Sequence, residues 1–174
     1  MVADRVHGNH GRLHVGTYLA LDGQDDWISV SDFRWPSSGP VTVEFRARVD
    51  AGGVYPRCAL TIGKLETPAW FFVRLPGEDN RLCWNYGHPE QREGWLDADL
   101  SPYLGRWVHV ALVSEGKGGG FMGIYLDGTL VAERPESDGP DGPLQGLSIG
   151  GTPPSDLYKG AIADFRLWDR RRSA

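Results

Sequence analysis

The clearest pattern in this chain is a strict alternation of apolar and polar residues over residues 41–50. The apolar positions are Val41, Val43, Phe45, Ala47 and Val49, and the polar positions between them are Thr42, Glu44, Arg46, Arg48 and Asp50. Side chains of a β-strand alternate between its two faces, so this spacing predicts a strand with one buried face and one face in water. A strand of this kind is typical of a sheet in a sandwich.

The stretch 105–128 forms the centre of the chain. It contains two short apolar runs, 107–113 and 121–126, separated by a glycine-rich tip. Both runs are rich in β-branched and aromatic residues, which predicts strands rather than helices. The Asp-Gly pair that follows supplies the positive φ angles of a two-residue turn, so we expect Leu130 and Val131 to fold back antiparallel onto the second run.

Further short segments have strand character and are separated by turn-forming residues. They are residues 18–22, 27–30, 58–64, 70–75, 81–86, 147–151 and 161–168. About twelve short strands at such intervals predict an all-β fold, an antiparallel two-sheet sandwich of jelly-roll type. We expect residues 1–15 to be a flexible N-terminal arm, residues 16–174 to form one domain, and residues 87–102 to form a long polar loop.

Composition supports this fold class and narrows the function classes. The 24 glycines and 12 prolines are what many turns between short strands require. A net charge of −5, with no cluster of basic residues before Arg170–Arg172, argues against a nucleic-acid partner. Nothing approaches the ~18 consecutive apolar residues of a membrane span. Residues 1–15 lack the apolar centre of a signal peptide, so either the protein is cytoplasmic or a leader has been removed.

The two cysteines, Cys58 and Cys83, do not require a disulfide. If the segments that carry them form a meander with 70–75 between them, the cysteines lie two strand spacings apart, roughly 9–10 Å. That exceeds the ~7 Å limit between the Cα atoms of a disulfide. We therefore expect free thiols.

Six segments follow one another in a recognisable order. They read LALDGQDDWISV, VTVEFRARV, FFVRLPGEDNRLCWNYG, GRWVHVALVSEG with GIYLDGTLVAE, LSIGG, and YKGAIADFRLWDRRRS. Together they resemble the laminin-G-like members of the concanavalin A-like lectin/glucanase superfamily, over nearly the whole chain. The resemblance implies two curved antiparallel sheets. It implies function far less, because this superfamily contains sugar binders, protein-binding modules and a few enzymes.

Two features depart from the pattern of that family. Its members often carry an acidic pair in the last strand, where this chain has Ala163 and Asp164, so only one carboxylate remains. Members also continue into a short helix after that strand, whereas this sequence ends at Ala174. We expect a module cut from a longer protein, monomeric in isolation, and belonging to a secreted or cell-surface protein rather than a cytoplasmic one.

We do not expect an enzyme. Glucanases of the superfamily need carboxylates alternating along one strand, so that two of them face the glycosidic bond. The required Glu-x-Asp-x-x-Glu run is absent, and Asp97 and Asp99, which have a spacing of two, fall in the predicted loop. No nucleophile elbow occurs, and neither cysteine has a supporting context.

The candidate metal ligands are Asp22, Asp25 and Asp26. Carboxylates interleaved with a turn-forming glycine match the oxygen ligands that calcium prefers, and jelly-roll relatives often hold a structural calcium near this position. Asp164 would join them from the last strand if the chain ends pair. The alternative is that these aspartates form turns by hydrogen-bonding local amides. No cofactor is required, and calcium is the one that the sequence allows.

A sugar-binding site needs aromatic rings with polar groups at their rim, because a pyranose has an apolar face and a girdle of hydroxyls. By resemblance, Trp107 and Trp168 fall at core positions of the family, and His109 is expected to be a hydrogen-bonded sheet residue. The predicted ligand-binding residues are Trp84, Tyr86 and Trp95, rimmed by Arg74, Asn80, His88 and Gln91. The alternative is that these aromatic residues belong to the core, as most do in sandwiches.

The sequence therefore predicts a single binding module whose ligand is a glycan. A protein-interaction module, which would present its loops or an apolar patch to a partner, remains an alternative. A structural module of a larger multidomain protein is a third possibility.

Overall fold

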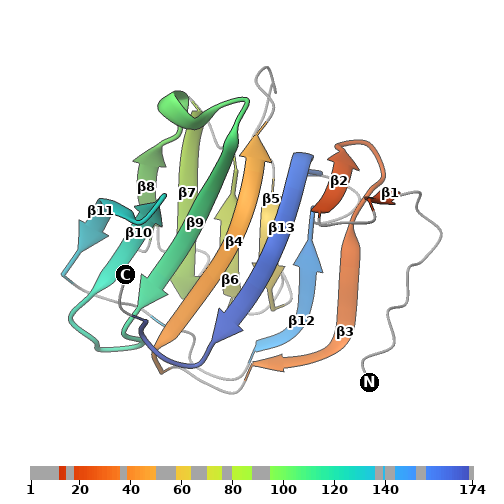
Figure 1. The fold of residues 1–174 in the computed structure, drawn as a ribbon. Coiled ribbons are helices and arrows are strands. Elements are labelled where there is room, and N and C mark those ends of the chain that lie inside the picture. Colours follow the sequence, from red (N-terminus) through yellow and green to blue (C-terminus); the bar gives the residue numbers. More distant parts are fainter. Residues whose placement is uncertain are drawn as a thin grey trace.

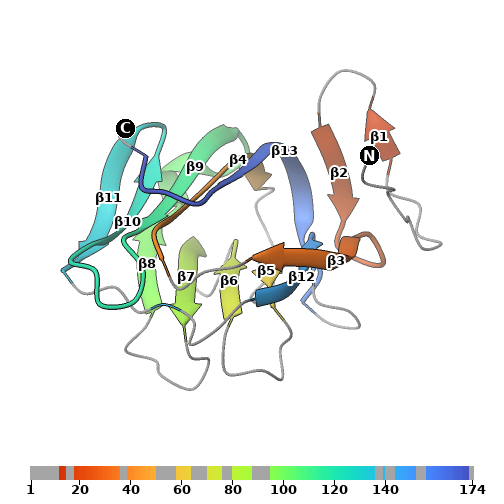
Figure 2. The ribbon, with the colours of Figure 1, turned by 90° about the horizontal axis from the view of Figure 1, so that it is seen from below.

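The two sheets of the predicted sandwich are present in the computed structural model. It describes residues 12–14, 18–35, 39–49, 58–63, 70–75, 80–87, 95–135, 139, 144–151 and 156–172. Figure 1 shows one sheet in front of the other, and Figure 2 shows the two layers from below. The helical element with described bounds is a short 3-10 turn, η3 (Ser101–Tyr103). The all-β prediction is confirmed, and no described helix is long and apolar enough to cross a membrane.

The front layer in Figure 1 is a seven-stranded antiparallel sheet. Its strands, in spatial order, are β1 (Arg12–His14), β2 (Tyr18–Asp22), β13 (Lys159–Trp168), β4 (Val41–Val49), β9 (Trp107–Ser114), β10 (Met122–Leu126) and β11 (Thr129–Arg134). β2 and β13, which are far apart in the sequence, therefore lie side by side in this sheet.

The second layer is a six-stranded antiparallel sheet. Its strands, in spatial order, are β3 (Ile28–Trp35), β12 (Leu144–Ile149), β5 (Cys58–Ile62), β6 (Trp70–Arg74), β7 (Arg81–Gly87) and β8 (Trp95–Asp99). Cys58 and Cys83 both pair with Arg74 from opposite sides, so β6 separates them, and both thiols are free as predicted.

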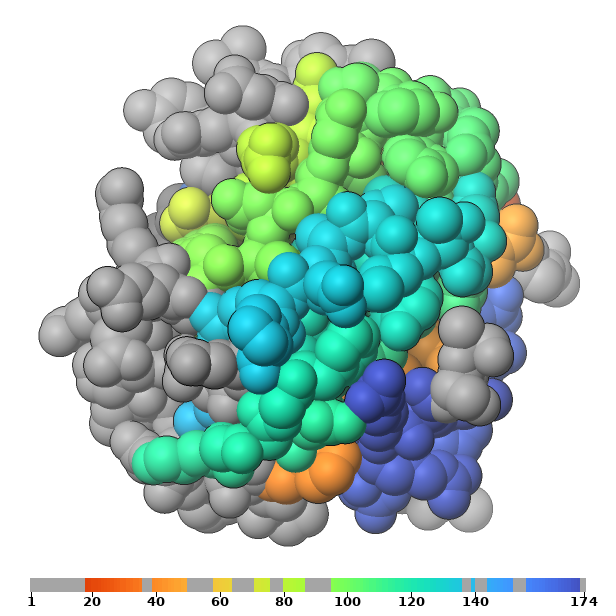
Figure 3. All heavy atoms as spheres, turned by 90° about the vertical axis from the view of Figure 1, so that its left-hand side faces the viewer, coloured from red at the N-terminus to blue at the C-terminus, as the bar shows by residue number. Residues whose placement is uncertain are grey.

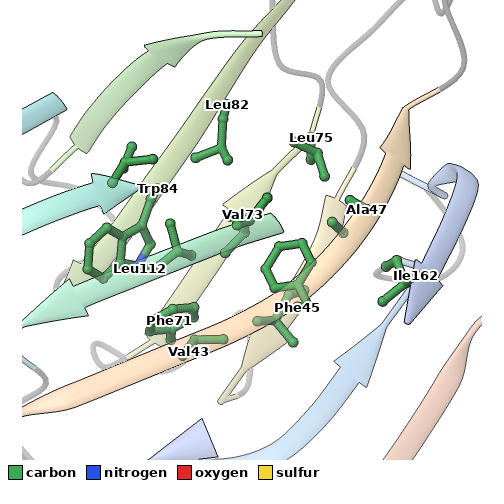
Figure 4. Packing of buried hydrophobic residues seen from close by; sticks show 14 of the residues in the cluster. Val43, Phe45, Ala47, Phe71, Val73, Leu75, Leu82, Trp84, Leu112 and Ile162 are labelled. Carbon is green, nitrogen blue, oxygen red and sulfur yellow. The ribbon is translucent and has the colours of Figure 1, made fainter. Parts of the chain in front are cut away.

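The core lies between the two sheets and follows the alternation of β4. All five apolar residues of that strand are buried, and Figure 4 shows Val43, Phe45 and Ala47 among the core side chains. Thr42 and Glu44, predicted to face water, are buried as well, because the C-terminal segment covers them. The prediction was right about which residues share a face and wrong about the exposure of these two.

The predicted hairpin at Asp127-Gly128 is confirmed. The two turn residues have φ angles of 49° and 79°, and Leu126 pairs with Thr129. Positive φ at both positions is what a two-residue turn between twisted strands requires. The hairpin fixes Leu130 opposite Tyr125 at the edge of the seven-stranded sheet.

Two sequence-based boundaries are wrong. The predicted loop 87–102 contains β8, in which Leu96 and Ala98 are buried and the residues alternating with them lie on the outer side. The flexible arm 1–15 contains β1, which pairs with β2, whereas residues 1–11 lie outside the described part of the chain. Both strands are short, and each depends on a neighbouring strand that the local sequence does not reveal.

Candidate functional site

The predicted aromatic platform is not formed, because two of its rings belong to the core. Trp84 and Tyr86 are completely buried between the sheets, and both rings contact Phe71, at centroid distances of 5.5 and 5.6 Å. Figure 4 shows Trp84 among these core side chains. Neither ring can stack on a ligand, so both assignments as ligand-binding residues are wrong.

The third ring of the predicted platform and its predicted rim residues are dispersed. Trp95 and Arg74 lie on the outer side of the six-stranded sheet, where the Arg74 guanidinium is 5.0 Å from the Trp95 ring centroid. Asn80 is exposed at a positive φ of 57°, and its carbonyl oxygen accepts a hydrogen bond from the Leu100 amide. His88 and Gln91 lie outside the described residues. The sheet thus separates Trp95 from the two rings with which it was grouped.

The predicted metal ligands divide in a similar way. Carboxylate oxygens of Asp22, Asp25 and Asp26 lie within 4.8 Å of one another, in the turn that leads from β2 to β3. Asp164 does not join them: Asp22 pairs with Lys159, which places Asp164 five residues further along β13, in a bulge of that strand. The chain ends pair as expected, but their register keeps the fourth carboxylate away.

Asp26 has an unusual position in this turn. Its side chain is buried, and Oδ2 accepts a hydrogen bond from the Asp22 amide at 3.2 Å. Its other oxygen, Oδ1, is buried without a hydrogen-bond partner among the described residues. A buried carboxylate oxygen without a donor is unfavourable, so this atom fits a bound cation. The donor set is all oxygen, which suits calcium.

The outer face of the seven-stranded sheet holds the best-formed site. Because side chains alternate along each strand, the residues that do not enter the core point outward here. In β9 these are Trp107, His109, Ala111 and Val113. Strand register places Arg46 of β4 opposite His109.

A hollow of ≈ 290 Å³ lies on this face. Its lining residues are Thr42, Glu44, His109, Ala111, Val113, Tyr125, Gly128 and Arg172. Ala111 and Val113 alternate along β9 on this face and form the small apolar floor of the hollow, although each side chain is itself largely buried. Polar side chains from β4, β9 and β10 surround that floor, which is the arrangement of a small-molecule site.

The C-terminal segment forms one wall of the hollow. One guanidinium nitrogen of Arg172 donates to both carboxylate oxygens of Glu44, at 2.9 and 3.1 Å. The Thr42 hydroxyl donates to the Arg170 carbonyl oxygen at 2.8 Å and accepts from the Arg172 amide at 3.0 Å. Arg171 pairs with Glu115 and lies over the Phe121 ring, and Figure 3 shows this blue segment against the teal segment near residue 120.

The opposite end of the hollow is set by the β10–β11 turn. The Asp127 carboxylate accepts hydrogen bonds from the His109 amide at 2.9 Å and from Arg106 at 2.8 Å. The His109 amide, with help from Arg106, holds the pKa of Asp127 below its ordinary value. The turn is therefore tied to β9 beside His109. Neither the His109 imidazole nor the Tyr125 hydroxyl donates to or accepts from another described side chain, so both are available to a ligand.

Two tryptophans expected in the core lie on this outer face instead. Trp107 is half-buried, and the guanidinium groups of Arg46 and Arg48 lie 5.5 and 5.9 Å from its ring centroid. Trp168 is half-buried as well, with Arg172 at 4.5 Å from its ring centroid. Alternation along the strand shows that Trp107 and Val108 face opposite ways, but it does not show which of them enters the core.

The site contains no pair of carboxylates for glycoside hydrolysis among its lining residues. Glu44 is the one carboxylate among them, and Arg172 already binds both of its oxygens. Glycosidases need two carboxyl groups on either side of the scissile bond. The arrangement can bind a small polar molecule over an apolar floor, and it has no acid–base pair for hydrolysis.

Comparison with known proteins places the chain in a superfamily. The family model described as concanavalin A-like lectin/glucanases superfamily matches residues 22–174. No curated protein matches at a significant level.

Solved structures of similar fold include three proteins of different biology. A native heptameric SAP-like pentraxin from Limulus polyphemus has a TM-score of 0.67 at 15% identity, over 90% of this chain and 77% of its own. Domain 4 of AbnA, an extracellular arabinanase from Geobacillus stearothermophilus in complex with arabinotriose, has a TM-score of 0.64 at 17% identity, over 91% and 73%.

The third is the botulinum neurotoxin serotype D ligand binding domain in complex with N-acetylneuraminic acid. It has a TM-score of 0.70 at 15% identity, over 95% of this chain but only 42% of its own. This chain thus spans less than half of the neurotoxin domain. At such identities these likenesses show the fold alone.

Proposed function

Because the chain belongs to the concanavalin A-like lectin/glucanase superfamily, in its laminin-G-like branch, we propose that it is a non-catalytic carbohydrate-binding module. We place its binding site at the hollow on the outer face of the seven-stranded sheet. The observation that carries the proposal is the apolar floor of Ala111 and Val113, rimmed by the unused polar groups of His109 and Tyr125. A sugar ring needs this combination, because it buries one apolar face and satisfies hydroxyls around its edge.

The kinds of ligand in the similar structures support the class and leave the sugar open. Arabinotriose is bound by the AbnA domain, and N-acetylneuraminic acid by the neurotoxin domain. A glycan-binding module acts where polysaccharides are, so we place the protein outside the cell or at its surface. AbnA, described as extracellular, is consistent with that location.

Binding to a panel of immobilised glycans tests the function. We expect the protein to bind at least one sugar, and Tyr125→Phe to weaken that binding about tenfold by removing one hydrogen bond in a desolvated site. Tyr103→Phe is the matched control: it makes the same chemical change in η3, outside the lining of the hollow. Failure of the whole panel, or equal loss in both variants, would reject the hollow as a glycan site.

A protein-binding module is the second candidate, and one surface favours it. β11 lies at the edge of the seven-stranded sheet and exposes Leu130 and Val131, the two large apolar side chains most exposed in the described part. An extended peptide could add to such an edge as a further strand. If the protein binds no glycan of the panel but binds a peptide, and Val131→Pro abolishes the peptide binding, this function is favoured over the first.

We also propose a structural calcium at the β2–β3 turn. Asp22, Asp25 and the unpaired Oδ1 of Asp26 would hold it, as charged oxygen ligands in a sharp turn. The ion would hold the turn together and would take no part in binding the sugar.

A further inference from the structure

The charge on the outer face of the seven-stranded sheet differs from that of the protein as a whole. The net charge of the chain is −5, yet many of its arginines come together on or beside this face. They are Arg46, Arg48, Arg106, Arg166, Arg170, Arg171 and Arg172. An acidic protein that gathers its basic residues on one face has a local field that favours anions there.

Three of these arginines form ion pairs with carboxylates of the same chain. Arg106 pairs with Asp127, Arg171 with Glu115, and Arg172 with Glu44. By contrast, the side chains of Arg46 and Arg166 have no ion pair or hydrogen bond to any residue that the structure describes. The exposed Asp164 of β13 and Asp169, which directly follows that strand, do not pair with Arg46 or Arg166.

The two unpaired arginines lie beside residues that line the hollow, although neither is a lining residue itself. Arg46 lies opposite His109 across the β4–β9 pair, and Arg166 lies opposite Glu44 across the β4–β13 pair. Arg46 and Arg166 are thus diagonal neighbours on one face, with the bulge of β13 between their pairs. Long side chains in that arrangement can bind one anion together. Glu44 does not compete for them, because Arg172 occupies both of its oxygens.

Trp107 holds one of the two in place. Its ring has the Arg46 guanidinium at 5.5 Å and the Arg48 guanidinium at 5.9 Å. Stacking on an aromatic face leaves the in-plane N–H donors of a guanidinium free and reduces the entropy lost when they bind. An anion bound beside the Arg46 guanidinium is attracted by its positive charge.

We propose that the hollow takes an anionic saccharide, a sugar unit with a carboxylate or a sulfate. The anionic group is bound by Arg46 and Arg166, while the ring lies over Ala111 and Val113 between His109 and Tyr125. Planar bidentate contacts between guanidinium and carboxylate or sulfate are the strong form of this recognition. The inference rests on the proposed function, since it names the class of glycan for the same site.

Paired polysaccharides test the charge requirement directly. Calorimetry measures binding to polygalacturonate and to its carboxyl-reduced form, and to chondroitin sulfate and to chondroitin after chemical desulfation. We expect at least tenfold tighter binding to one charged polymer than to its less charged partner. The pair that shows the difference identifies carboxylate or sulfate as the bound group.

Variants locate the contact. Arg46→Gln with Arg166→Gln should weaken binding of the charged polymer at least tenfold and flatten its dependence on salt. Arg81→Gln, which removes an exposed arginine of the six-stranded sheet that lies near Asp97, should leave both unchanged. Circular dichroism and thermal melting confirm that each variant is folded.

The outcomes separate the two proposals. If a neutral sugar binds at the hollow and the charged polymers bind no better, the anionic inference is wrong and the carbohydrate function stands. If the charged polymers bind but the double variant and Arg81→Gln lose affinity equally, the effect is general charge and Arg46 and Arg166 are not the site. If no saccharide binds, both proposals fail.

Discussion

At the scale of single residues, the wall of the hollow depends on the ion pair between Glu44 and Arg172. Glu44 is largely buried, and its carboxylate accepts both hydrogen bonds from one guanidinium nitrogen. We predict that Arg172→Ala lowers the free energy of unfolding by about 1–2 kcal/mol at neutral pH, because it leaves a buried carboxylate unpaired. The loss stays below that of a fully buried pair because the Arg172 side chain is 41% exposed and water screens it. Urea denaturation measures it.

The control for that pair is Arg170→Ala. Arg170 also lies over the Trp168 ring, at 5.4 Å, but has no ion pair with a described acid, so its loss should cost less than about 0.5 kcal/mol. Combining Glu44→Gln with Arg172→Ala should cost less than the sum of the single changes, since no charge is then left unpaired. Equal effects of Arg170→Ala and Arg172→Ala would show that the pair does not stabilise the segment.

Cys58 gives a prediction about alkaline pH. Burial raises the pKa of the Cys58 thiol from 9.0 to about 12. Because the folded pKa is the higher one, the unfolded chain releases this proton first, and stability is fully present below about pH 9 and is lost as pH rises towards 12. Unfolding free energies at pH 8 and pH 10.5 should therefore differ less in Cys58→Ala than in the wild type.

Other groups contribute to the same fall, so the comparison must be made between proteins. Burial also raises the pKa of Cys83 and of Tyr86 to about 12, and both remain in Cys58→Ala. A parallel pH dependence in the wild type and the variant would mean that the Cys58 thiol does not contribute.

At the scale of elements, two positions with positive φ require glycine for different physical reasons. Gly128 ends the β10–β11 turn at φ 79°, with nothing within 4 Å of an added Cβ, so only backbone strain opposes a side chain. Gly160 lies where β13 pairs with β4, and an added Cβ would be 2.2 Å from the Arg48 carbonyl oxygen. We predict a cost of about 1 kcal/mol for Gly128→Ala and on the order of 3 kcal/mol or more for Gly160→Ala.

Denaturation of the two glycine variants under identical conditions checks this difference. The Gly160→Ala effect should be larger because strand pairing fixes the backbone oxygen that it would meet, whereas the turn of Gly128 faces open space. Costs of equal size would show that β13 can move away from β4 without loss.

The elements also show what the sequence could and could not predict. In β4 the side chains on one face are all apolar and those on the other face are polar, so the sequence alone predicts which face points inward. In β9 both faces of the strand are largely apolar. Val108, Val110 and Leu112 lie on one face, and Trp107 is among the residues on the other. Period two then tells which residues share a face, but not which face meets the second sheet. That choice depends on strands far away in the chain.

The same limit explains the misplaced platform and the missed hollow. Leu82, Trp84 and Tyr86 do share a face, as predicted, but that face is the inner one of the six-stranded sheet. The hollow needs Arg172 packed on Glu44, a contact between residues 128 positions apart. Local sequence patterns do not predict a contact between residues so far apart in the chain. The binding face could therefore be found only from the three-dimensional structure.

At the scale of the whole molecule, the β2–β3 turn joins the two layers. Asp22 ends a strand of the seven-stranded sheet, and Asp26 lies just before β3 of the six-stranded sheet. Gly150, at the end of β12, packs against both sides of this junction: an added Cβ would be 2.9 Å from Leu21 and 3.3 Å from the Asp26 carbonyl oxygen. A cation held by the aspartates would therefore link the sheets.

An ion at that junction should stabilise the whole folded domain against unfolding, and not only the turn. We predict that calcium at about a hundredfold excess over its dissociation constant adds about 2.7 kcal/mol, which raises the melting temperature by about 5–10 °C over protein in chelator. Asp26→Asn should abolish the rise, since it removes the charge of the buried, unpaired oxygen, whereas Asp32→Asn, an exposed change in β3, should retain it. If the melting temperature is the same in calcium and in chelator, these aspartates are turn formers and the two layers are held together by their core alone.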